Sequence, residues 1–320
     1  MKNTIALYLI VFFTSIFCLP GISNAQTPAP IIYLRAKVDH LRLRAKPDKN
    51  AAVVTELPEN TQLHYLGESG GQIEQVTLRG VAHNARWYKV APAGNDAKSG
   101  WVYGGAVALS SVFLPQGVSP ASIHEDFLDI RKVIKSDFEK GLSNAQNGLL
   151  QDTLAHRVDK TTIKLNFDNG KQRMVRDTVN PESDGESDKV YNYHGQFADI
   201  GQYVVEVLGY EWNVMQFIDR RNGKTLENLG SPFGLPSLSP NKKWVALGYG
   251  DPYEIAGGLQ VFLADKTGLY TAFNIRLDVY QATKLYWPTD TGELFFAMEA
   301  VDGNESIHPT QYFRLKILEP

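Results

Sequence analysis

Short segments with an apolar residue at every second position, separated by turn residues, follow one another from about residue 33 onward. In the segment HLRLRAKPDKNAAVVTELPENTQLHYLGESG, Leu41 and Leu43 alternate with basic residues, which is typical of a half-buried strand. The same reading predicts further strands at residues 53–57, 62–66, 87–90 and 100–103. Five short strands within about 70 residues indicate a small barrel.

The order and spacing of these blocks resemble those of the bacterial SH3 (SH3b) domain. The blocks that carry the resemblance are Leu41-Arg42-Leu43-Arg44, Pro47, Val53 to Leu57, Leu66-Gly67-Glu68, Trp87-Tyr88-Lys89-Val90 and Gly100-Trp101-Val102. The resemblance implies a binding module with an SH3-like barrel over residues 33–109, and it does not name a ligand. Residues 70–86 exceed the family pattern, which predicts an extra hairpin or a loop over the barrel.

Five aromatic residues in this part are candidates for stacking on a peptide or a glycan. Trp87 and Trp101 occupy strand positions that a small barrel needs for its core, so we assign them to the core. Tyr88 and Tyr103 alternate with them and should face the other way. We therefore take Tyr65, Tyr88 and Tyr103 as candidate ligand-binding residues.

A helix is predicted next, over residues 119–141. Ser119 and Pro120 suit its first positions, and Gly141 suits its end. Between them, Ile123, Phe127 and Ile130 recur at steps of three and four residues, which predicts an amphipathic helix linking two domains.

Residues 142–320 predict an all-β domain. Gly170, Gly223 and Gly268 each close a polar turn after an apolar strand, at separations of 53 and 45 residues. Tyr203 and Trp244, 41 residues apart, each begin an apolar strand, and periods of about 40–50 residues are typical of propeller blades. The segment Ser239 to Ala246, SPNKKWVA, is similar to a turn and strand of TolB- and WD-type blades. The domain is therefore expected to be propeller-like, with a β-sandwich as the alternative.

The first 25 residues have the features of a secretory signal peptide. An apolar run from Thr4 to Leu19 ends at Pro20-Gly21, and Ser23-Asn24-Ala25 places small residues before a cut at Gln26. We expect a periplasmic or secreted protein with no membrane insertion after cleavage. Cleavage would also remove Cys18, the only cysteine, and with it any disulfide or thiol chemistry.

Charge and motifs limit the remaining function classes. The formal net charge of −3 argues against nucleic acid or an anionic membrane surface as a partner. The seven histidines form no zinc-type pair, and the chain has no GxSxG elbow, P-loop or dinucleotide fingerprint. We therefore expect no enzyme activity, no metal and no cofactor. The acidic segment 181–188 (PESDGESD) is taken as a solvated loop, with calcium binding as the minor alternative.

Aromatic residues also gather around apparent loops of the C-terminal part. Tyr210, Trp212, Tyr249 and Tyr253 predict a possible rim for a ligand. Asp251 and Glu254 lie within this group and are the carboxylate pair that glycoside cleavage would need. The ordinary aromatic content of β-sheets is the competing interpretation.

The function that these observations favour is an exported, non-catalytic binding protein. Its SH3b module would bind a cell-wall peptide or an envelope protein. Two alternatives stay open, namely a hydrolase of envelope glycan or peptide that uses a carboxylate pair, and a periplasmic inhibitor of another enzyme.

Overall fold

The computed structural model describes residues 29–318 apart from 96, 124–126, 152–154, 180–184, 186, 251–256, 290 and 302–308. The predicted signal peptide lies outside the described residues. The described part is mainly β, as expected from the sequence, with several sheets and one α-helix. No sheet in this part closes into a barrel.

The strands, given in chain order, are β1 Ile31–Ala36, β2 Leu41–Arg44, β3 Val53–Leu57, β4 Gln62–Leu78, β5 Val81–Pro92, β6 Gly100–Tyr103, β7 Val107–Leu114, β8 Leu128–Lys132, β9 Ala155–Arg157, β10 Thr162–Asn166, β11 Gln172–Arg176, β12 Lys189–Phe197, β13 Gln202–Gly209, β14 Asn213–Asp219, β15 Thr225–Glu227, β16 Ser231–Leu238, β17 Trp244–Gly250, β18 Gly257–Asp265, β19 Gly268–Leu277, β20 Tyr280–Tyr286, β21 Leu294–Ala300 and β22 Gln311–Ile317. Helix α1 spans Lys135–Ser143, and short 3₁₀ turns lie at Gly104–Ala106, Pro120–Ser122 and Ala198–Ile200.

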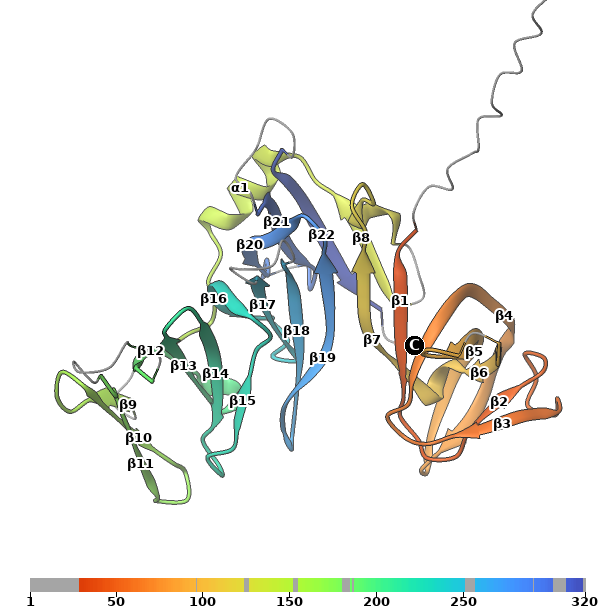
Figure 1. Ribbon diagram of the computed structural model, residues 1–320, viewed down its shortest axis with the longest axis horizontal. Coiled ribbons are helices and arrows are strands. Elements are labelled where there is room, and N and C mark those ends of the chain that lie inside the picture. Colours follow the sequence, from red (N-terminus) through yellow and green to blue (C-terminus); the bar gives the residue numbers. More distant parts are fainter. Residues whose placement is uncertain are drawn as a thin grey trace, which may run out of the picture.

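The C-terminal part is a series of antiparallel sheets that follow one another along the chain (Figure 1). Strands β9 to β11 form the first sheet and β12 to β15 the second. Strands β16 to β19 form the third, and β20 to β22 form the fourth together with β8. Neighbouring sheets pack face to face around separate apolar cores. The similarity to propeller blades is not confirmed and stays a prediction.

Each middle sheet contributes side chains to two cores, because successive residues of a strand point to opposite faces. In β13, Tyr203 and Val205 belong to the core shared with β9–β11, whereas Val204 belongs to the core shared with β16–β19. In β17, Val245 lies in the second of these cores and Ala246 in the next one. This double burial explains the continuous apolar runs of these strands, which have no polar face.

Helix α1 covers the outer face of the fourth sheet (Figure 1). Phe138 is fully buried there, with its ring 5.3 Å from that of Tyr286 and 4.9 Å from that of Tyr312. The Tyr286 hydroxyl donates a hydrogen bond to the Phe138 carbonyl oxygen at 3.0 Å. Helix and sheet therefore share one small core.

The predicted helix 119–141 is wrong over most of its length. The α-helix begins only at Lys135, and residues 128–132 form β8, which pairs antiparallel with β22. Leu128 and Ile130 are buried while Arg131 is exposed. The apolar spacing of this segment fits a strand as well as a helix, and the free edge of β22 selects the strand.

The N-terminal part consists of β1 to β7, and the sheet order there is β7-β1-β4-β5-β6-β2-β3. The predicted strands form at their expected positions. Two of them are longer than predicted, because β4 and β5 continue through residues 70–86 as a hairpin. The inner face carries fully buried side chains, namely Leu34, Leu43, Leu63, Val90 and Val102.

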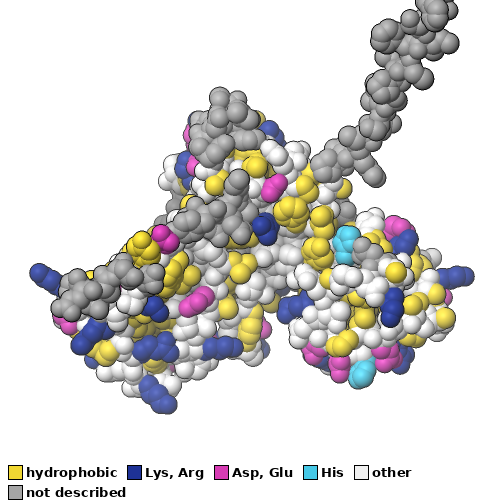
Figure 2. Space-filling view, viewed as in Figure 1, with side chains coloured by type: hydrophobic (Ala, Val, Ile, Leu, Met, Phe, Trp, Pro, Cys, Tyr) yellow, Lys and Arg dark blue, Asp and Glu magenta, His cyan; other side chains and the backbone are white. Residues whose placement is uncertain are grey.

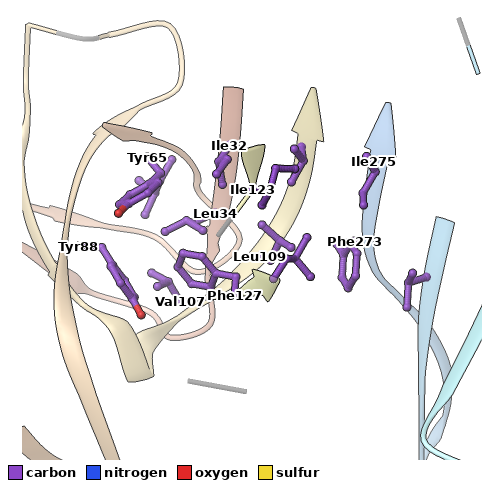
Figure 3. Close-up of a cluster of buried hydrophobic side chains, with 14 of the residues drawn as sticks. Ile32, Leu34, Tyr65, Tyr88, Val107, Leu109, Ile123, Phe127, Phe273 and Ile275 are labelled. Carbon is purple, nitrogen blue, oxygen red and sulfur yellow. The ribbon is translucent and has the colours of Figure 1, made fainter. Parts of the chain in front are cut away.

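One parallel strand pair connects this N-terminal part to the C-terminal sheets. Residues Ser111 to Leu114 of β7 pair with Asn274 to Leu277 of β19. Through this pair, β16–β19 and β1–β7 form a single sheet of 11 strands. Figure 3 shows Phe127 beside Val107 and Leu109 of β7, with Phe273 of β19 on the other side. The apolar core is therefore continuous across the junction.

Candidate binding sites

The three tyrosines predicted to bind ligand in the N-terminal part are buried. Tyr65, Tyr88 and Tyr103 are 5%, 2% and 5% exposed, so a role as surface contacts is wrong for the described structure. The ring of Tyr88 lies 4.8 Å from that of Phe127, which comes from beyond the domain. The alternation of Trp87 and Tyr88 across the strand exists, but both faces of the strand are covered here.

Tyr103 has a structural role that its polar group supports. Its hydroxyl lies 2.7 Å from the carbonyl oxygens of both Glu74 and His83 in the β4–β5 hairpin. Burial raises the pKa of this hydroxyl. The side chain therefore fixes β6 to the base of the hairpin.

Trp101, which the sequence assigns to the core, is the partly exposed aromatic residue of β6. Its ring rests on the backbone of Gly70, where a Cβ atom would lie 2.9 Å from two ring carbons. The ring of Pro47 borders the same place, 3.5 Å from that Cβ position. Glycine at position 70 is thus what allows the indole to approach the hairpin this closely.

A cross-strand row passes through Trp101. Lys89 of β5 is opposite Trp101, which is opposite Arg44 of β2, which is opposite Val53 of β3. We call these four residues the Trp101 row. All four are at least partly exposed, whereas their neighbours Val90, Val102 and Leu43 are buried. The row therefore lies on the outer face of the sheet.

The basic side chains in the row have local partners. The Lys89 ammonium lies 2.6 Å from a carboxylate oxygen of Glu68, and Arg44 Nη1 donates to the Ala51 carbonyl oxygen at 2.6 Å. These contacts fix the two side chains on strands that flank Trp101. The surface combines an aromatic face, an aliphatic side chain and hydrogen-bond donors, which suits an extended peptide.

The predicted C-terminal rim is not assembled as a single group in the described residues. Tyr210 and Trp212 are 50% and 39% exposed at the turn between β13 and β14, and the Lys189 ammonium lies 5.8 Å from the Trp212 ring centre. Tyr249 instead belongs to β17 of the next sheet. Its ring packs over Gly258, and burial raises the pKa of its hydroxyl to about 12. Tyr253, Asp251 and Glu254 lie outside the described residues.

A cavity of about 880 Å³ lies where β7 and β19 separate. The two strands pair only over their last residues, and earlier they diverge, so that Val107 to Leu109 and Gly268 to Phe273 line opposite walls. Figure 2 shows the hollow between the two lobes of the molecule. We call it the fork cavity. Its two walls are more than 150 residues apart in the chain, so the local sequence pattern does not show that they meet.

Charged side chains line the fork cavity on both sides. From the N-terminal part come Arg35, Lys37, Arg79 and Glu59, and from the C-terminal part come Lys224, Asp219 and Asp265. Burial lowers the pKa of the Lys37 ammonium. The alternation of Arg35 and Lys37 with the buried Leu34 and Ala36 is the sequence signal that could have identified this wall.

The acids of the cavity are held by their own neighbours. Burial alone would raise the pKa of Asp219, but hydrogen bonds from Arg221 outweigh it and lower that pKa overall. The Thr267 hydroxyl and the backbone N–H groups of Thr267 and Gly268 lower the pKa of Asp265. Glu59 forms an ion pair with Arg79 at 3.0 Å.

The described residues contain neither a cluster of metal ligands nor a membrane-spanning helix. Within the described part of the chain, no three His, Cys, Asp or Glu side chains are grouped as a metal site would require. Most of the acidic segment 181–188, the minor candidate for calcium, lies outside that part. Among the helices that can be described, none has the length and apolar character needed to cross a bilayer.

Comparison with known families identifies the N-terminal part. Residues 39–108 match the model of the bacterial SH3 domain, which agrees with the resemblance seen in the sequence. Domains of this family typically bind the cell wall and its peptidoglycan, and they often occur in extracellular or envelope proteins. The search found no significant match to a curated protein or to a solved structure.

Proposed function

We propose that this chain is a non-catalytic binding protein of the cell envelope whose bacterial SH3 domain binds cell-wall peptide through the Trp101 row. The observation that carries the proposal is the partly exposed indole of Trp101, seated on Gly70 within the part that matches the domain family. An aromatic face that is already fixed loses little conformational entropy on binding.

The chemistry of the row supports a peptide as the ligand. A peptide backbone offers carbonyl oxygens to Lys89 and Arg44, and small aliphatic side chains can pack on Trp101 and Val53. Strand β3 is at the end of the sheet order, so its outer edge has backbone groups to offer an extended chain. The row lies beside that edge.

The test is sedimentation of the protein with purified cell wall. We expect the protein to pellet with the wall and Trp101→Ala to lower the pelleted fraction at least several-fold. Trp212→Ala is the matched control, because it removes an exposed tryptophan from a distant sheet. Loss of binding in the Trp212 variant alone would move the site to the C-terminal sheets. Capture of an envelope protein without wall binding would favour the protein partner instead.

Export is part of the proposal and rests on the N-terminal sequence. The pattern from Thr4 to Ala25 predicts cleavage before Gln26, which would deliver the protein to the periplasm or the medium. Mass spectrometry of the mature protein should give Gln26 as the first residue. An intact Met1 would contradict export by this route.

The absence of catalysis is also proposed and needs its own measurement. Mature protein incubated with purified peptidoglycan should release no soluble fragments. Release that is lost on Glu254→Gln would instead support the hydrolase alternative, with Asp251 as the partner carboxylate. This assay is independent of the sedimentation experiment, so binding and cleavage can be separated.

A further inference from the structure

The fork cavity is a second concave site, separate from the Trp101 row. Its volume of about 880 Å³ falls in the range of small-ligand sites. It exists because β7 and β19 pair over four residues and then diverge, which leaves a wedge with apolar side chains at its closed end. Figure 3 shows Leu109, Phe127 and Phe273 at this end. The wedge is thus formed by two strands that the fold itself holds apart.

Three basic groups face this wedge without an acidic partner among the described residues. Arg35 and Lys37 are two positions apart and therefore lie on the same face, away from the core. Arg35 has only the Asn60 amide oxygen nearby, at 3.4 Å, and Lys37 has no side-chain hydrogen bond or ion pair to any described residue. Lys224, on the opposite wall, likewise has none within that part of the chain. Lys37 is partly buried, whereas Arg35 and Lys224 are exposed at the mouth of the cavity. A partly buried cation without a counter-charge favours an anionic ligand.

The balance of charge in the cavity favours a ligand with a single negative charge. The cavity wall has four basic groups and three acidic ones, which leaves a formal surplus of one positive charge. Asp219 and Asp265 would repel a doubly charged phosphate more strongly than a carboxylate. The apolar side chains of Leu226, Trp244 and Tyr270 line the rest of the wall. A carboxylate attached to a small apolar body matches both features.

We propose that the fork cavity binds a carboxylate-bearing ligand of short-peptide size, with the carboxylate held by Arg35 and Lys37 and the remainder lying along Trp244 and Tyr270. This site is additional to the wall-binding surface around Trp101. Because the cavity has walls from both parts of the molecule, an occupied site would also hold the two parts together.

The probe is N-acetyl-dialanine with a free carboxyl terminus, and its C-terminal amide is the control. Isothermal titration of the full-length mature protein should show binding of the acid and at least about tenfold weaker binding of the amide. Equal affinity for acid and amide, or no binding of either at millimolar concentration, would overturn the proposal.

Variants locate the site. Lys37→Gln should weaken binding of the acid by about tenfold and leave binding of the amide unchanged. Lys224→Gln, at an exposed position, guards against a folding defect and should weaken binding of the acid by a smaller factor. Lys171→Gln is the matched control, because Lys171 is exposed in the β10–β11 turn, away from the cavity. An unchanged affinity in both Lys37→Gln and Lys224→Gln would overturn the assignment.

The same variants separate the two possible sources of the carboxylate. If free peptides are the ligands, Lys37→Gln should lose dialanine binding and still pellet with the cell wall. If wall-attached peptides enter the cavity, Lys37→Gln should lose both. Either result supports a carboxylate site, and loss of wall binding in Trp101→Ala alone tests the proposed function separately.

Discussion

The two kinds of junction between sheets in this molecule differ in how much space they leave for a ligand. Neighbouring C-terminal sheets meet face to face, and alternating side chains such as Val204 and Val205 fill the space on both sides of a sheet. The N-terminal part meets these sheets edge to edge, through the short pairing of β7 with β19 and the core around Phe127. The face-packed sheets share filled apolar cores, whereas the edge junction leaves a wedge. The fork cavity is therefore a consequence of how the parts are joined.

The largest effect is expected from removing the edge junction. The sequence predicts that a fragment ending at Leu109 folds as a separate barrel. However, β7 continues to Leu114 and pairs with β1, and Phe127 covers Tyr88. We expect residues 29–109 to lack cooperative unfolding, and a fragment ending at Lys132 to be better ordered. Dispersed amide signals in the NMR spectrum of the shorter fragment would show that it folds alone and would support the prediction of a separate barrel.

A smaller effect should follow from a single substitution at the same junction. Phe127 is 3% exposed and its ring contacts those of Tyr65 and Tyr88. Phe127→Ala should lower the free energy of unfolding by about 3–5 kcal/mol in urea denaturation. Phe167→Ala is the control, since Phe167 is a partly exposed phenylalanine after β10, away from the junction, and should cost clearly less. Equal costs would mean that the junction adds nothing specific.

A still smaller effect is expected from two substitutions in β6. The sequence assigned Trp101 to the core and Tyr103 to the surface, and the structure predicts the opposite order of stability loss. Tyr103→Ala removes a buried ring and its contacts to the hairpin carbonyls, and should cost about 3 kcal/mol or more. Trp101→Ala removes a partly exposed ring and should cost less, while lowering wall binding. Thermal melting and sedimentation of both variants check this. A larger loss of stability for Trp101→Ala than for Tyr103→Ala would instead support the assignment of Trp101 to the core.

The smallest effect is expected in the pH dependence of stability, through the carboxylate of Asp219. The net lowering of the pKa of Asp219 means that the folded state binds its proton less readily than the unfolded state. Its contribution to stability is therefore complete above the unfolded pKa of about 4 and is lost as the pH falls through the lower folded value. Asp219→Asn should lower the free energy of unfolding by about 1–2 kcal/mol at pH 7, with little difference from wild type near pH 2.

Asp199→Asn is the control for the acid experiment. Asp199 forms an exposed ion pair with Lys242 at 2.8 Å, and such pairs contribute little. Its effect should stay within about 0.5 kcal/mol at every pH. Denaturation curves recorded at several pH values compare the two variants. A constant difference between Asp219→Asn and wild type down to pH 2 would contradict the assigned role.

The alternation of apolar and polar residues correctly predicted the strands that depend only on nearby residues. Strands at 41–44, 53–57 and 100–103 form where the alternation places them. The helix at 119–141 failed because Ile123, Phe127 and Ile130 follow helical steps while Leu128 and Ile130 also alternate as in a strand. The choice between the two depends on β22, far along the chain. The order of the sheets along the chain also reflects local turns and hairpins.

The candidate sites were harder to predict for a related reason. Alternation showed that Trp87 and Tyr88 face opposite ways, but it could not show that Phe127 covers the second face. Nor could it show that Trp101 rests on Gly70 in the hairpin. The walls of the fork cavity come from residues brought together by pairing between positions 111–114 and 274–277. Long-range pairing therefore decides which side chains remain available to a ligand.

The pairing of β8 with β22 also sets an order of events during synthesis. Leu128 has Ile317 as its partner, so β8 leaves the ribosome long before its neighbour exists. At 5–20 residues per second, the wait is roughly 10–40 s. During that interval the apolar side chains of β8 have no sheet to join, whereas β7 already has β1 as its partner. Strand β8 is therefore the natural place for a chaperone to bind or a protease to cut. The segment that joins the two parts is thus among the first to be made and the last to be secured.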